Sequence, residues 1–280
     1  MQDPRDVAQG GIDPWHEFAQ TAEGVAEKAV TEFEAAWPRM PIDLYEPTFE
    51  ETLTALAARQ VRFFWLMSND PHLWQPDLGS ITLRGMTDGL VNLRLIATGG
   101  VDAAKRFQEH SMGNLKLQKL HIEKLIDSGA LPADWEDRAS ELQGMIDLHK
   151  WEETIAIDLG AWNNETAREN AVSADLKAEY DLYYARGSAH VHGEWSALLE
   201  TVVAVCQEPL HRFHQVPHPP MLIPRSPRFL IDAIDLLRSS FRTWSETTHA
   251  PLPDLEPEGD RFRVAAARLI ERFAKRHPSH

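Results

Sequence analysis

Residues 180–200, which read YDLYYARGSAHVHGEWSALLE, hold more proton-transferring and anion-binding side chains than any other stretch of the chain. The residues that could do chemistry are Arg186, His190 and His192. A histidine titrates near neutral pH, so its imidazole can both accept and return a proton. An arginine guanidinium can stabilise the charge that develops on a phosphate. The residue types therefore suggest acid–base chemistry on a phosphate ester.

Two local structures fit this stretch. As one continuous helix it has a polar stripe of four residues: Tyr180, Tyr184, Ser188 and His192. A second stripe lies roughly 200° around the helix: Arg186, His190 and Glu194. Glycine costs about 1 kcal/mol in a helix interior, so the chain can instead break at Gly187, with Ser188 capping a new helix. In that second structure, Arg186 could fold back beside His192.

A polar pair also occurs in an apolar segment at residues 80–98, which reads SITLRGMTDGLVNLRLIAT. We expect this segment to form a helix that Ser80 caps. Arg84 and Asp88 are four residues apart in this helix, which should be central because its apolar residues are dense. They form either a local ion pair or a buried pair facing the stripe that contains Tyr184, Ser188 and His192. We predict the second arrangement.

The composition limits the classes of function. With 280 residues, 43% apolar content and nine tryptophans, the chain can bury a large core. A net charge of −15 argues against a broad nucleic-acid surface, but leaves room for a local basic pocket. One cysteine, Cys206, excludes a disulfide framework, and no apolar run is long enough for a membrane span. The start of the chain lacks a signal pattern, so we expect a cytoplasmic protein.

Helical periodicity in the apolar segments predicts an all-α, multi-helix bundle. We expect an N-terminal helical arm and linker at residues 1–47, a helical core domain at 48–208, and a proline-rich connector with C-terminal helices at 209–280. Within the core, the helix that starts at Ser80 should end at Gly99-Gly100, and a second long helix should run from residue 101 to 127. Further helices are expected at residues 132–157 and from about residue 175 to Cys206, and the last helix from residue 260.

The two segments ITLRGMTDGLVNLRLIA and YDLYYARGSAHVHGEW, about a hundred residues apart, resemble a bacterial family of uncharacterised all-helical proteins. That family pairs an Arg-x-x-x-acid helix with a Tyr/Ser/His helix. The resemblance covers roughly residues 49–200, with Asp88 at a position where the family pattern has glutamate. It implies a fold class and no activity.

The spacing of Arg186 and His192 in RGSAHVH also resembles HEPN (higher eukaryotes and prokaryotes nucleotide-binding) domains, whose signature is an arginine followed after four to six residues by a histidine. This resemblance implies a HEPN-like helical core, a homodimer and RNA cleavage without metal. The glycine after Arg186 departs from the polar residue common in those domains.

Two functions follow from these patterns. The first is a metal-independent RNA endonuclease of a bacterial toxin or phage-defence type. His192 and His190 would transfer protons, Arg186 would bind the phosphate, and Arg84, Asp88, Tyr184 and Ser188 would support them. The second is a noncatalytic helical binding or regulatory protein with a buried polar seam. The partners expected for the chain are RNA, a second copy of the chain, and a partner protein or, for a toxin, an antitoxin. The chain has no glycine-rich phosphate loop and no paired Glu-x-x-His motifs, so we expect no cofactor and no metal.

Overall fold

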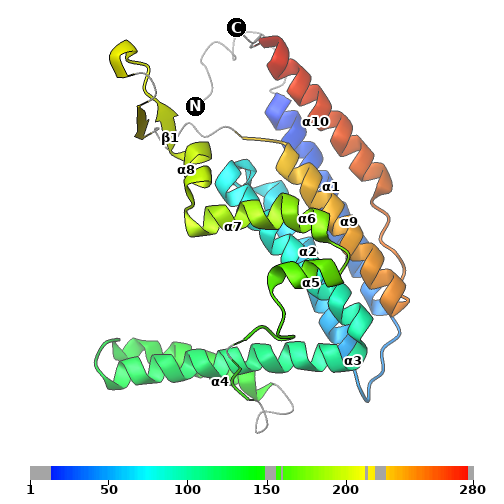
Figure 1. Cartoon of the computed structure of the whole chain (residues 1–280). Helices are drawn as coiled ribbons and strands as arrows, with labels where there is room; N and C mark the ends of the chain where they lie inside the picture. The colour runs from blue at the N-terminus through cyan, green and yellow to red at the C-terminus, as the bar shows by residue number, and fades with distance from the viewer. Residues whose placement is uncertain (1–13, 149–155, 159, 212–213, 218–224, 277–280) are drawn as a thin grey trace.

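The fold is all-α, as the apolar periodicity predicts, and the computed structural model describes residues 14–148, 156–158, 160–211, 214–217 and 225–276. At its centre, α2 (Thr48–Asn69), the first half of α3 (Pro76–Asp127) and α9 (Arg228–Thr248) pack against one another. Helix α1 (Pro14–Ala36) lies on α2, and α10 (Glu256–Arg276) lies on α1 and α9 (Figure 1). Short 3-10 turns occur at Trp37–Arg39, Pro71–Trp74 and Pro209–His211.

Helix α1 belongs to the core. Phe18, Ala22, Val25, Ala29 and Phe33 recur every three or four residues, which places them on one face, and all five are buried in the same cluster as α2, α3 and α9. The expectation of a peripheral N-terminal arm therefore does not describe how this helix packs. The boundaries at residues 47 and 208 remain predictions about which parts fold independently.

Helix α3 is bent at Gly100, whose φ of 66° and ψ of −157° interrupt the helix where the sequence predicts. The half after the bend leaves the bundle, and α4 (Glu136–Asp147) packs along it (Figure 1). Helix α4 is shorter than the predicted helix at 132–157, because a 3-10 turn (Ala133–Trp135) precedes it and Ile157 is not helical. Residues 149–155 of that expected helix lie outside the described residues.

The N-terminal end of α3 also differs from expectation. The helix begins at Pro76, one turn before Ser80, since proline fits the first helical turn. Ser80 is therefore an interior residue of α3 rather than its cap, and it is only 2% exposed. Its hydroxyl is buried and has no hydrogen-bond partner among the described residues.

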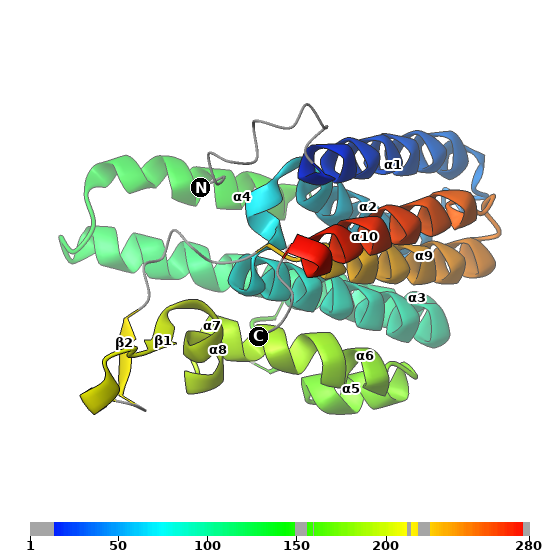
Figure 2. The same ribbon diagram turned by 90° about the horizontal axis from the view of Figure 1, so that it is seen from above.

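A second layer crosses α3 and consists of α5 (Ala167–Ser173), α6 (Lys177–Glu179), a π-helical turn (Tyr180–Tyr184), α7 (Ala185–His192) and α8 (Trp195–Thr201), as Figure 2 shows. The predicted single helix to Cys206 is wrong. Gly193 adopts φ 62° and ψ 37°, which ends α7, and the chain turns into α8. After α8, β1 (Val203–Val205) pairs antiparallel with β2 (Gln215–Pro217), so Cys206 follows a strand and is partly exposed.

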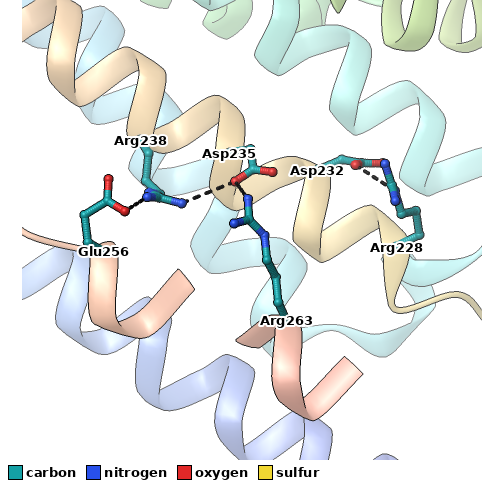
Figure 3. A network of polar contacts seen from close by, with 6 residues as sticks. All are labelled: Arg228, Asp232, Asp235, Arg238, Glu256 and Arg263. Atoms are coloured by element: carbon teal, nitrogen blue, oxygen red, sulfur yellow. Dashed lines mark hydrogen bonds and ion pairs between the residues drawn. The ribbon is translucent and has the colours of Figure 1, made fainter. Parts of the chain in front are cut away.

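An ion-pair network joins α9 to α10 (Figure 3). The Asp235 carboxylate accepts hydrogen bonds from Arg263 Nη2 at 2.6 Å and from Arg238 Nη1 at 3.5 Å, and Arg238 also pairs with Glu256. Exposed pairs of this kind contribute modestly to stability. Burial of apolar side chains such as Phe262, whose ring lies 5.0 Å from that of Phe18, contributes more to holding α10. Helix α10 begins at Glu256, one turn before the predicted residue 260.

Candidate functional site

Helix α7 continues through Gly187, which settles the choice between the two local structures. Gly187 is buried against α3, and a Cβ at this position would lie 2.4 Å from the Ser80 carbonyl oxygen and 2.5 Å from Arg84 Cβ. Glycine is therefore needed for close approach of the two helices and not for a break. The break occurs at Gly193 instead.

Two neighbouring tyrosines in the π-helical turn before α7 contact different helices. Its hydrogen bond from the Ala185 N–H to the Tyr180 carbonyl spans five residues instead of four. Tyr184 points to α3, where Arg84 Nη2 donates to its hydroxyl at 3.2 Å, whereas Tyr183 hydrogen-bonds Asp232 on α9. Such π turns inside helices often occur at functional sites.

Arg84 on α3 and Tyr184 on the π-helical turn form a polar seam, which is part of the expected arrangement, whereas neither Arg84 nor Asp88 hydrogen-bonds Ser188 or His192 among the described residues. The Arg84 guanidinium lies 4.7 Å above the Tyr184 ring, which stacks on the Tyr180 ring at 4.7 Å. Burial raises the pKa of the Asp88 carboxyl, and the positive charges of Arg84 and Arg59 oppose that rise. The seam joins the two segments on which the sequence resemblance rests.

Arg186 forms an ion pair with Glu200, a residue that was not among the candidate site residues predicted from the sequence. Arg186 Nη2 donates to Glu200 Oε2 at 2.7 Å, and His190 Nε2 lies 3.6 Å from the same oxygen. In a continuous helix, residues 186 and 200 would be about 21 Å apart along the axis, so the predicted helix hid this contact. The glycine at 193 was the available signal, since it allows α8 to fold back.

The two histidines differ in exposure. The His190 side chain is only 3% exposed, and its Nε2 has no hydrogen-bond partner among the described residues. His192 is exposed at the end of α7, and Ser188 is half-buried. His192 lies six positions after Arg186, so at about 100° per residue the two side chains point roughly 120° apart around α7. Arg186 does not fold back beside His192, so this helix alone does not bring the two to one point.

A cavity of about 390 Å³ lies where α3, α7 and α9 meet. Its charged lining residues are Arg186, Arg225, Arg228 and Asp232, and its other walls include Ser80, Leu83, Tyr183 and Phe229. Arg228 Nε donates to Asp232 Oδ1 at 2.9 Å (Figure 3). Burial and the nearby Asp232 carboxylate raise the pKa of the Tyr183 hydroxyl to about 12, so this group stays protonated and donates a hydrogen bond.

Two further observations concern the part of the chain that the structure describes. No three histidine, cysteine, aspartate or glutamate side chains there are grouped so that they could hold a metal ion. No described helix is both long and apolar enough to cross a membrane.

A family of unknown function, DUF5677, matches residues 63–208, just over half of the 280-residue chain. The chain therefore belongs to this family. The matched segment begins in α2 and ends after β1, so it includes the Arg84–Tyr184 seam, Arg186, both histidines and Glu200. It does not include Arg225, Arg228 or Asp232. No curated protein and no solved structure matches the chain.

Proposed function

We propose that this protein is a metal-independent RNA endonuclease of a bacterial toxin or phage-defence type. The observation that carries the proposal is the position of Arg186. Glu200 holds its guanidinium beside a cavity that two further arginines line, in a chain whose net charge is −15. A local concentration of arginines in an acidic protein favours binding of a phosphate-bearing ligand.

His192 is the proposed proton-transfer residue, because it is exposed and lies on the same helix as Arg186. Its imidazole accepts the proton of a ribose 2′-hydroxyl, and the 2′-oxygen attacks the adjacent phosphorus. The bond from phosphorus to the 5′-oxygen breaks, and the imidazolium returns the proton to that oxygen. The products are a 2′,3′-cyclic phosphate and a 5′-hydroxyl end. Arg186 stabilises the negative charge of the phosphate.

The remaining candidate residues have supporting roles in this proposal. His190 is too buried to reach RNA, so it and Glu200 position Arg186. Arg84, Asp88 and Tyr184 hold α7 against α3 rather than contact substrate. Ser188 is half-buried on α7 and orients the phosphate.

The divergence of Arg186 and His192 suggests that two copies complete the site. Large apolar side chains are exposed on α7 and α8, the helices before and after the turn that follows His192: Val191 is 49% exposed, Trp195 56% and Leu199 43%. Such a surface favours association, and a second copy docked there would bring its α7 next to the first. The proposed active form is therefore a homodimer.

The proposal is tested with purified protein and a single-stranded RNA in excess EDTA. We expect cleavage to persist in EDTA and the His192→Ala and Arg186→Ala variants to lose activity by about 10²- to 10⁴-fold. Arg242→Ala, which changes an exposed arginine on α9, is the charge-matched control and should cleave normally. A His192→Ala protein with full nuclease activity would place the active site elsewhere.

The second candidate is a noncatalytic regulatory protein whose polar groups serve as a structural seam. It is favoured by the internal pairing of Arg84 with Tyr184 and of Arg186 with Glu200. In that case the apolar α7–α8 surface binds a partner protein or antitoxin. A wild-type protein that cleaves no RNA, together with a His192→Ala variant that loses partner binding, would favour this function.

A further inference from the structure

We infer that the cavity between α3, α7 and α9 is a binding site for a small phosphate monoester that carries a flat aromatic ring, as a nucleoside monophosphate does. The inference does not depend on RNA cleavage, since a regulatory protein could use the same site.

Three arginines are among the residues that line the cavity. Arg186, Arg225 and Arg228 line the cavity together with Asp232, and Arg186 is already paired with Glu200 at 2.7 Å. Arg228 and the Tyr183 hydroxyl already hydrogen-bond the Asp232 carboxylate. Arg225 forms no ion pair within the described part of the chain, although acidic residues outnumber basic ones by 43 to 28. Since Arg186 is paired with Glu200 and Arg228 with Asp232, Arg225 supplies the positive charge of the lining that has no ion pair among the described residues, and this charge favours an anionic group such as a phosphate.

Ser80 is one of the lining residues and is only 2% exposed, and its buried hydroxyl has no hydrogen-bond partner among the described residues. A serine inside a helix commonly donates to the carbonyl four residues earlier, and Ser80 does not do so. A buried polar group without a partner is costly unless a ligand or water satisfies it. A phosphate oxygen in the cavity would accept this hydrogen bond.

Part of the cavity lining is apolar and includes Phe229 and Leu83. The Phe229 ring is fixed on one side by Gly79, where an added Cβ would lie 2.7 Å from two of its ring atoms. On another side the Arg186 guanidinium lies 5.5 Å from the ring centre. Leu83 is buried beside it in the same lining. Phe229 is itself only 4% exposed, so a flat ring joined to a phosphate would pack against this apolar part of the lining, next to the arginines, rather than stack on an open ring face.

The size of the cavity agrees with this class of ligand. A volume of about 390 Å³ lies within the range of roughly 300–1,000 Å³ that is usual for small-molecule sites. The close packing at Gly79 and Gly187 brings the three helices together around it. These contacts connect α3 to both α9 and α7, so the walls are already formed without a ligand.

The inference is tested by isothermal titration calorimetry on the full chain in phosphate-free buffer. The probes are adenosine monophosphate, adenosine and inorganic phosphate. We expect adenosine monophosphate to bind at least about tenfold more tightly than either of its parts, because only it uses both the arginines and the apolar part of the lining. Equal affinity for inorganic phosphate would reduce the site to a simple anion site and overturn the claim of a flat aromatic ring. No binding of either phosphate probe would overturn the inference entirely.

Matched variants locate the binding. Arg225→Ala and Ser80→Ala should each weaken adenosine monophosphate binding by about tenfold or more, whereas Arg242→Ala should not change it. His192→Ala should also bind normally, since His192 does not line the cavity. This separates the inference from the proposed nuclease, which requires His192. Equal binding by Arg225→Ala, Ser80→Ala and Arg242→Ala would place the ligand elsewhere.

Discussion

Substituting Gly187 by alanine tests the close contact that positions α7. Alanine favours a helix over glycine by about 1 kcal/mol, so helix propensity alone predicts a more stable protein. In this structure the new methyl group would lie 2.4 Å from the Ser80 carbonyl oxygen and 2.5 Å from Arg84 Cβ. Both distances are roughly 1 Å below ordinary van der Waals contact, and the carbonyl belongs to a helix that cannot yield locally.

The change in unfolding free energy of Gly187→Ala is the difference between these opposing effects. Overpacking of this kind typically costs about 1–3 kcal/mol, and outward movement of α7 would also weaken the Arg84–Tyr184 contact. We expect a net destabilisation of about 1–3 kcal/mol, which lowers the Tm of a chain of this size by several degrees, at about 2–4 °C per kcal/mol.

The assay is thermal or urea unfolding of Gly187→Ala beside Gly24→Ala as a control. Gly24 lies within α1, where an added Cβ has nothing within 4 Å, so this variant should gain about 0.5–1 kcal/mol. Equal stabilisation of both variants would refute the contact between α7 and α3 at Ser80.

Three further predictions concern the Arg84–Tyr184 contact, the titration of Asp88 and the homodimer. Tyr184→Phe should lose about 0.5–3 kcal/mol of unfolding free energy in urea, since Arg84 loses its hydroxyl acceptor; an unchanged midpoint would argue against this bond. Burial raises the folded-state pKa of Asp88, so the folded state holds its proton more tightly and this group lowers stability as pH rises above about 4. Asp88→Asn should therefore gain stability relative to wild type between about pH 4 and pH 7 in urea titrations, and a constant difference would contradict this. Light scattering at micromolar concentration should give twice the 31.8 kDa chain mass, and a monomer mass would remove the homodimer.

The sequence predicts the helices whose apolar faces are buried on the bundle. Helix α1 was expected as a helical arm, although Phe18, Ala22 and Phe33 share one apolar face that indicates burial, and the bend in α3 is recognisable from the glycine pair that includes Gly100. These features depend on neighbours close in sequence. Local patterns are sufficient to specify them.

The candidate site was only partly predictable, because its contacts join residues far apart in the chain. The sequence predicted that Arg84 and Asp88 face the stripe of Tyr184, Ser188 and His192, and the structure shows such a contact for Arg84 with Tyr184. The Glu200 contact was hidden, since it depends on a left-handed glycine at 193 that turns α8 back. A helical pattern does not show which glycine ends the helix and which one packs.

The cavity was missed for a related reason. Arg225 was assigned to a proline-rich connector and Ser80 to a helix cap, and neither pattern indicates a ligand. Only the meeting of α3, α7 and α9 brings these residues to the same lining. Three-helix junctions depend on tertiary packing that single-segment periodicity does not encode.

The central claim is RNA cleavage without metal, and the most direct measurement is end-group analysis of a short RNA after incubation in EDTA. Mass spectrometry of the products should show 2′,3′-cyclic phosphate and 5′-hydroxyl ends with the wild-type protein. The same ends should be strongly reduced with His192→Ala, which loses the proposed proton-transfer group. Intact RNA with the wild type, or products with 5′-phosphate ends that disappear in EDTA, would contradict the proposed function.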